Sequence, residues 1–290
     1  MRNQRNAFWE KYGIFIFFAV FSALLLSVCS MCSFLFPIHD RVDQNVFFTV
    51  GREILNGKVI YRDLFEHKGP LTYFIHAAAA LISETSFLGI YLIEIVSLTV
   101  FLIFAYKTAL FFTNRQFSFY SAMLLSVVLL CSECFQRGDN VEELCLPLLM
   151  ISMYYLLRAI PLPRHPNPRP QSSAVIFLNG LLFGSVLWIK FNLVGFWIGW
   201  SCVTFLPLLF RKEFRTFFLR VLLFFTGFAV TALPWILYFY QKDALYDFLY
   251  TYFYCNIFLY KDDTGLLLRL ASILFGMGRN LIGNLVLIAA

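Results

Sequence analysis

The residues best suited to chemistry lie in two acidic stretches, each of which follows a long apolar run. The first holds Asp40 and Asp43 and continues to Pro70 as the densest patch of charge in a chain that is 60% hydrophobic and 14% charged. The second holds Glu142 and Glu143. Cations that could bind an anionic group are expected on the same face, namely Arg52, Arg62, Lys68, Arg137 and Lys190. We therefore expect an active site where the two stretches meet.

A purely structural interpretation of Asp43 is also open. A predicted amphipathic helix over 44–56 follows it directly, with apolar residues recurring on one face. An Asp at this place can cap the first free amides of the helix. Against that interpretation, a second carboxylate, Asp40, lies only three residues away. The acidic outer loops are also expected to converge on the same face.

The other charged residues have structural alternatives as well. Glu142 and Glu143 begin a predicted helix, where acids stabilise the helix dipole. Lys190 ends another apolar run and could extend to the membrane interface. Glu94 lies inside a predicted span, so we expect it to face protein or water. Glu66 and His67 are weak candidates for metal ligands, because two adjacent residues rarely make a site; no cofactor is assigned, and a divalent cation is left open.

The composition predicts an all-α, polytopic bundle of transmembrane helices. The mean hydropathy is +0.73, and several apolar runs reach the ~20 residues that cross a bilayer. We predict about eight spans. They are 13–36, 87–112, 118–133, 144–160, 174–190, 193–210, 217–240 and 266–290. The run 70–83 is short for a span and suits a juxtamembrane helix at the interface.

The placement of charge predicts the topology. With a cytoplasmic N-terminus and a non-crossing segment 70–83, the cytoplasmic loops hold 12 of the 23 basic residues. The outer segments 37–86, 133–143 and 241–265 then hold 14 of the 17 acidic residues. This distribution follows the positive-inside rule. If 70–83 crossed, the basic loops would face outward.

The chain stops inside an apolar run at Ala290. We expect residues 1–290 to form one transmembrane module, with 37–86 as its catalytic outer loop and a C-terminal part missing.

The motifs of both acidic stretches resemble those of GT-C glycosyltransferases. The resemblance is to the protein-mannosyltransferase and lipid A aminoarabinose-transferase superfamily, in its bacterial glycosyltransferase family 39-like branch. The matching motifs are Asp43, Val50-Gly51-Arg52-Glu53, Leu55-Asn56-Gly57, Tyr61-Arg62-Asp63, His67-Lys68-Gly69-Pro70 and Gly138-Asp139-Asn140-Val141-Glu142-Glu143. The resemblance covers about residues 38–260.

The resemblance implies transfer of a sugar from a polyprenyl-phosphate donor to an acceptor on the outer face. It implies that Asp43 is the catalytic carboxylate, acting as general base in an inverting attack, and that Lys68 holds the donor phosphate. Many relatives carry Asp-Glu where this chain has Asp43-Gln44, so Glu142 or Glu143 is expected to supply the second acid. Further phosphate partners are Arg62, Arg137 and Lys190, and the expected positioning residues are Asp40, Asp63, Asn140 and Asn192.

The expected partners are the lipid-linked donor, membrane lipid and an acceptor that is a lipid, a polysaccharide or a protein, with no nucleic acid. The expected location is a cell membrane, with the bacterial inner membrane favoured. Two other functions stay open. A transporter or flippase would favour broken helices and intramembrane charge, whereas Glu94 is the one acid well inside a predicted span. A non-catalytic remnant is the other, because the chain ends abruptly.

Overall fold

The computed structural model describes residues 2–132, 135, 137–259, 271–272, 274–276 and 278–279. Within these residues the regular structure is helical, apart from two isolated bridges, which confirms the all-α prediction. The helices are α1 (Arg2–Cys29), α2 (Val42–Leu55), α3 (Pro70–Ala80), α4 (Leu88–Ala109), α5 (Arg115–Leu130), α6 (Val141–Leu157), α7 (Ser173–Ile189), η1 (Phe191–Gly195), α8 (Phe196–Phe210), α9 (Phe214–Gln241), α10 (Leu245–Phe248) and η2 (Leu249–Leu259).

Four helices in the described part of the chain are long and apolar enough to cross a membrane. These candidate spans are Tyr12–Cys29, Leu88–Ala109, Phe191–Phe210 and Phe214–Gln241. Helices α5 and α7 are apolar but shorter. The chain is therefore a multi-pass membrane protein, while the predicted total of eight spans stays a prediction. The last predicted span, 266–290, lies mostly outside the described residues.

The first predicted span, 13–36, is too long at its C-terminal end. Helix α1 ends at Cys29, and the chain then turns through serines whose hydroxyls bond to groups of α4 and α1. The Ser30 hydroxyl donates to Glu94 over 2.7 Å, and the Ser33 hydroxyl donates to the Ser27 carbonyl over 2.7 Å. Hydropathy alone does not detect these contacts, because residues 31–36 are mainly apolar.

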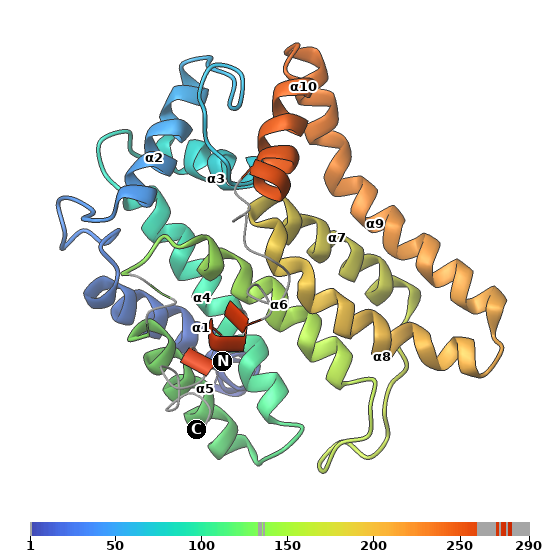
Figure 1. Cartoon of the computed structure of the whole chain (residues 1–290). Coiled ribbons are helices and arrows are strands. Elements are labelled where there is room, and N and C mark those ends of the chain that lie inside the picture. Colours follow the sequence, from blue (N-terminus) through green and yellow to red (C-terminus); the bar gives the residue numbers. More distant parts are fainter. Residues whose placement is uncertain are drawn as a thin grey trace.

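Helices α2, α3 and α10 gather at one end of the bundle, and the loop between α6 and α7 lies at the opposite end (Figure 1). The end that carries α2 and α3 is called the loop end below. Helix α3 has 11 residues, so it is about 16 Å long and cannot cross a bilayer core of ~30 Å. This length agrees with the prediction that 70–83 does not cross.

Helix α2 confirms the predicted amphipathic helix with slightly different bounds. It runs from Val42 to Leu55, and its buried side chains include Phe47 and Val50. Its N-cap is Arg41, without a side-chain cap. Because the helix begins two residues earlier than predicted, Asp43 lies in its first turn, and the capping interpretation of Asp43 is wrong.

Close contacts fix the elements of the loop end to one another. Gly51 of α2 lies so near α3 that an added Cβ would come within 2.6 Å of the His76 carbonyl carbon. Gly89 of α4 approaches the backbone of Ala79 at the end of α3 in the same way. A continuous core then extends from α2 and α3 to α7 and α9, with Tyr73, Trp188 and Phe239 almost fully buried. The loop end is therefore a packed unit rather than a loose set of loops.

Candidate active site

Asp43 of α2 faces Lys68 across the loop end. The Lys68 Nζ atom lies 4.0 Å from the Asp43 Oδ2 atom. The Asp43 side chain is 68% exposed, whereas that of Lys68 is only 15% exposed. The geometry thus presents an accessible carboxylate beside a largely enclosed ammonium group.

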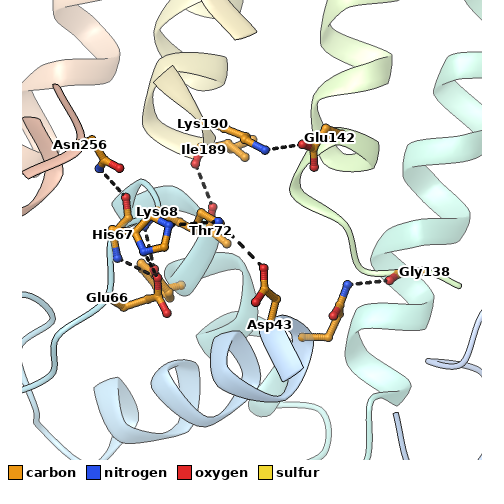
Figure 2. A network of polar contacts seen from close by, with 12 residues as sticks. Asp43, Glu66, His67, Lys68, Thr72, Gly138, Glu142, Ile189, Lys190 and Asn256 are labelled. Atoms are coloured by element: carbon orange, nitrogen blue, oxygen red, sulfur yellow. Dashed lines mark hydrogen bonds and ion pairs between the residues drawn. The ribbon is translucent and has the colours of Figure 1, made fainter. Parts of the chain in front are cut away.

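Lys68 is the last member of a short polar chain that begins at Glu66 (Figure 2). The Glu66 carboxylate lies 3.0 Å from the His67 Nδ1 atom and also accepts from the His67 amide over 2.7 Å. The Lys68 ammonium lies 3.3 Å from the His67 Nε2 atom. Since an ammonium group can only donate, Nε2 must accept and Nδ1 carries the ring proton. The imidazole therefore links a carboxylate to the lysine.

The electrostatics of Glu66 fit this arrangement. Burial raises the pKa of Glu66, but the hydrogen bonds from the side chain and amide of His67 outweigh burial and hold it below its usual value. Glu66 therefore stays ionised at neutral pH and keeps the His67 ring oriented toward Lys68.

The backbone of this segment is joined to the end of α7. The Gly69 amide donates to the Ile189 carbonyl over 3.0 Å, and the Thr72 hydroxyl donates to the same carbonyl over 3.3 Å. A Cβ atom on residue 69 would lie 2.0 Å from the Trp188 carbonyl oxygen. Only glycine allows this approach, which brings the segment carrying Lys68 beside the segment carrying Lys190.

Three further contacts hold the same backbone. The Tyr61 hydroxyl donates to the Lys68 carbonyl over 2.6 Å, and the Lys68 amide donates to the Tyr73 hydroxyl over 3.1 Å. The Asn256 side chain donates to the His67 carbonyl over 2.8 Å. Sequence reasoning did not single out Tyr73 or Asn256. The signal available for Asn256 was its polar side chain within the mainly apolar run 244–259.

The second acidic stretch reaches the same place through Glu142. Glu142 lies in the first turn of α6 and bonds to Lys190, which follows α7 directly. Both side chains stay partly exposed, at 34% and 25%. Figure 2 shows the Glu142–Lys190 pair and the Asp43–Lys68 pair close to one another, although the four residues come from four different segments. Lys190 therefore contacts protein instead of only extending to the membrane surface.

Glu143, the neighbour of Glu142, is turned away from that opening. It is 6% exposed, and the closest acidic groups that act on it are Glu94 and Asp139. Glu94 is itself fully buried, which confirms that it faces protein. Asn140 precedes α6 directly, as its N-cap residue.

The two predicted arginines have other partners in the structure. Arg137 bonds to Asp40 over 2.7 Å. Arg62 bonds to Asp63 over 2.9 Å and to the Lys242 carbonyl over 2.6 Å. The guanidinium of Arg62 and the amide of Val59 hold the pKa of Asp63 down at about 2. Both arginines are therefore paired with carboxylates other than Asp43 and Glu142.

The predicted positions that remain are Asn192 and the candidate metal ligands Glu66 and His67. Asn192 is exposed in the short helix η1. Glu66 and His67 contact each other, and no group of three or more His, Cys, Asp or Glu side chains suited to a metal occurs among the described residues.

An apolar groove of about 560 Å³ extends along the bundle beside these pairs. Its lining residues include Leu71, Ile75, Leu92, Val96, Leu144, Leu148, Ile151 and Ile189. Ile189 adjoins Lys190, and Leu144 lies two residues beyond Glu142. One end of the groove therefore lies next to the charged pairs, and its walls come from α3, α4, α6 and α7. Such a groove can hold a hydrocarbon chain.

Comparison with known proteins gives one match. Residues 67–238 match the sequence model of the family described as dolichyl-phosphate-mannose-protein mannosyltransferase. The matched part includes Lys68, Glu142 and Lys190, whereas Asp43 lies before it. No curated protein and no solved structure matches the chain.

Proposed function

Since the chain belongs to the dolichyl-phosphate-mannose-protein mannosyltransferase family and is a membrane glycosyltransferase of the GT-C type, we propose that it transfers a sugar from a polyprenyl-phosphate donor to an acceptor at the loop end. One observation carries this proposal: the apolar groove is lined by Leu71 and Ile189, which lie three residues from Lys68 and next to Lys190 in the chain, and Lys68 pairs with the exposed carboxylate of Asp43. The groove would hold the lipid tail of the donor, the two lysines would hold its phosphate, and the sugar would react beside Asp43.

The two lysines are proposed to bind the donor phosphate. In a polyprenyl-phosphate sugar, phosphate is the leaving group, so its departure needs neutralisation of charge more than a strong acid. Lys68 is oriented by His67 and Lys190 by Glu142, so both ammonium groups are held before the donor arrives. Arg62 and Arg137 remain secondary candidates, because they bond to Asp63 and Asp40 and not to Asp43, the proposed base.

Asp43 is proposed as the general base. Its carboxylate is the exposed member of the Asp43–Lys68 pair, so an acceptor hydroxyl can reach it. A base on the side opposite to the leaving phosphate removes the hydroxyl proton as the oxygen attacks the anomeric carbon. This geometry would invert the anomeric configuration. Glu142 then serves to position Lys190. Asp40, Asp63, Asn140 and Asn192 are proposed as the residues that position the substrates.

The loop end is proposed to face outward, with the N-terminus in the cytoplasm. Helices α2 and α3 of the acidic segment 37–86 lie at this end together with α10, and the basic loop 158–172 lies at the other (Figure 1). The positive-inside rule supports this orientation.

The test compares two carboxylate substitutions on the same helix. Asp43→Asn keeps the size of the side chain and removes the base, whereas Glu53→Gln changes an acid near the far end of α2. Purified protein in liposomes receives a panel of radiolabelled polyprenyl-phosphate sugars with lipid, polysaccharide and protein acceptors. Asp43→Asn should lose transfer by roughly 10²-fold or more, the usual contribution of a general base, while Glu53→Gln transfers normally.

Undiminished transfer by a correctly inserted Asp43→Asn protein would overturn the assignment of the base. Movement of lipid-linked sugar across the liposome membrane without any transfer would instead support the transporter alternative.

A further inference from the structure

A cluster of buried polar side chains adjoins the proposed site and takes no part in the proposed chemistry. His76 of α3 and Glu94 of α4 are fully buried, and Asp139 is 1% exposed. Glu143 of α6 adjoins them, and neither of its carboxylate oxygens has a hydrogen-bond partner among the described residues. Polar groups are costly to bury, so this cluster calls for an explanation beyond packing.

The contacts of His76 show that it shares a proton with Asp139. The His76 Nδ1 atom lies 2.7 Å from the Thr72 carbonyl, which can only accept, so Nδ1 carries a proton. The His76 Nε2 atom lies 2.9 and 3.0 Å from the two Asp139 oxygens. Burial lowers the pKa of His76, but the charge and hydrogen bond of Asp139 outweigh burial and raise it above its usual value. A charged or proton-sharing pair therefore joins α3 to the segment before α6.

That segment has an unfavourable backbone conformation. Arg137, Gly138 and Asp139 have φ angles of 69°, 103° and 57° in succession. The left-handed region is unfavourable for residues other than glycine, so Arg137 and Asp139 need outside contacts to stay there. The contacts come from the loop after α1 and from helices α2, α3 and α4. We call this segment, residues 137–139, the junction.

Each contact of the junction links it to a different part of the fold. The Met31 amide donates to the Arg137 carbonyl over 2.8 Å, and the Asp139 amide donates to Glu94 over 2.8 Å. The Gln44 side chain donates to the Gly138 carbonyl over 3.4 Å. Gln44 is the residue next to Asp43.

The junction also leads directly into α6, where Glu142 holds Lys190. Asp139 lies three residues before Glu142, and α6 begins at Val141. Residues 137–139 therefore lie between the helix that carries Asp43 and the helix that carries Glu142. A shift of the junction would change the separation of the base from one of the two lysines.

We propose that His76 is a positioning residue for the glycosyl transfer: its contact with Asp139 holds residues 137–139 so that Asp43 and the Glu142–Lys190 pair keep their separation. The expected fall in kcat rests on the proposed function, because it requires that the protein transfers a sugar. The expected loosening of residues 137–139 rests on geometry alone. His76 touches neither donor nor acceptor in this view. It acts through Asp139.

The kinetic experiment uses two substitutions at His76 and one matched control. His76→Leu removes both hydrogen bonds, whereas His76→Gln keeps an amide N–H that can reach Asp139. Asn179→Leu is the control, because Asn179 is equally buried and bonds to Ser152 between α6 and α7. His76→Leu should lower kcat by roughly 10- to 100-fold, as expected for misplaced reacting groups, with the donor KM changed less than about twofold. His76→Gln should recover most of kcat, and Asn179→Leu should keep it.

Equal kcat losses in His76→Leu and Asn179→Leu would overturn the proposal, because they would indicate a general effect of a damaged core. A His76→Gln protein no better than His76→Leu would also overturn it. If His76→Leu does not accumulate in membranes, His76→Ala, which also removes both hydrogen bonds, replaces it, and its kcat must then fall below those of His76→Gln and Asn179→Leu.

Hydrogen exchange separates this inference from the proposed function. In His76→Leu, or in His76→Ala if the first protein does not accumulate, the amides of residues 137–141 and of the first turn of α2 should exchange at least tenfold faster than in the wild type. Asn179→Leu should leave them unchanged. This result would support the positioning role even if the wild-type protein transferred no sugar. Unchanged exchange at these amides would overturn the role even if Asp43 proved to be the base.

Discussion

Replacement of Gly69 by alanine tests the link between the segment carrying Lys68 and the end of α7. Residue 69 has φ −70° and ψ 152°, which alanine adopts freely, so the effect would be purely steric. The added Cβ would lie 2.0 Å from the Trp188 carbonyl oxygen, whereas ordinary contact starts at 3.4 Å. The two segments must therefore separate by roughly 1.4 Å, the difference between these two distances.

A separation of this size would break the hydrogen bond from the Gly69 amide to Ile189, now 3.0 Å long. It would also move Lys68 relative to Lys190 and Asp43. Crowding of this kind costs about 1–3 kcal/mol of stability, and misplacement of reacting groups by about 1 Å can lower the rate by 10²-fold. We therefore expect kcat/KM for sugar transfer to fall by about 100-fold while the protein stays folded.

The assay measures initial rates of transfer in liposomes together with thermal unfolding of the same samples. Gly199→Ala in α8 is the matched control, because no atom lies within 4 Å of the added Cβ, and alanine favours a helix over glycine by about 1 kcal/mol. It should transfer normally and unfold at the same or a higher temperature. Wild-type transfer by Gly69→Ala would refute the idea that this contact sets the site.

Three further predictions follow from the charged pairs and the groove. Lys190→Met should raise the donor KM by roughly 10-fold or more, since a hydrogen bond to a charged group contributes about 1.5–3 kcal/mol; a donor titration checks it, and an unchanged KM contradicts it. Val96→Trp should raise the KM of long-chain donors by roughly the tenfold that corresponds to 1.4 kcal/mol and leave short-chain donors unaffected, which a chain-length series would show. The pKa of Asp63 falls from 3.8 to about 2 on folding, so its stabilising effect is complete above 3.8 and is lost as the pH falls toward 2. Asp63→Asn should therefore flatten the fall of the unfolding temperature over that pH range, and an unchanged slope would show that the carboxylate contributes nothing there.

The helices of the loop end could be predicted from the sequence because their patterns are local. The apolar period of α2 and the shortness of the run after Pro70 depend on neighbouring residues alone, and both predictions agree with the structure. The start of α2 was missed by two residues. Helix starts depend on which residue supplies the cap, and here Arg41 takes that place without a capping side chain.

The charged residues of the candidate site could be proposed from the sequence, but their pairing could not. Glu142 and Lys190 are 48 positions apart, and His76 and Asp139 are 63 positions apart. Neighbouring helical residues point about 100° apart, so Glu142 and Glu143 cannot both face the same opening. Sequence reasoning treated them as equivalent, whereas the packing of α6 against α4 turns one of them inward.

The segment from Glu66 to Gly69 is held mainly through its main chain, and this has a consequence for how specificity can change. The carbonyls of His67 and Lys68 and the amide of Gly69 make the anchoring bonds. Side chains at 66–68 can therefore be exchanged while the course of the chain is preserved. During evolution, or in a library randomised at positions 66 and 67 with Lys68 and Gly69 kept, new headgroup preferences can arise without a new scaffold.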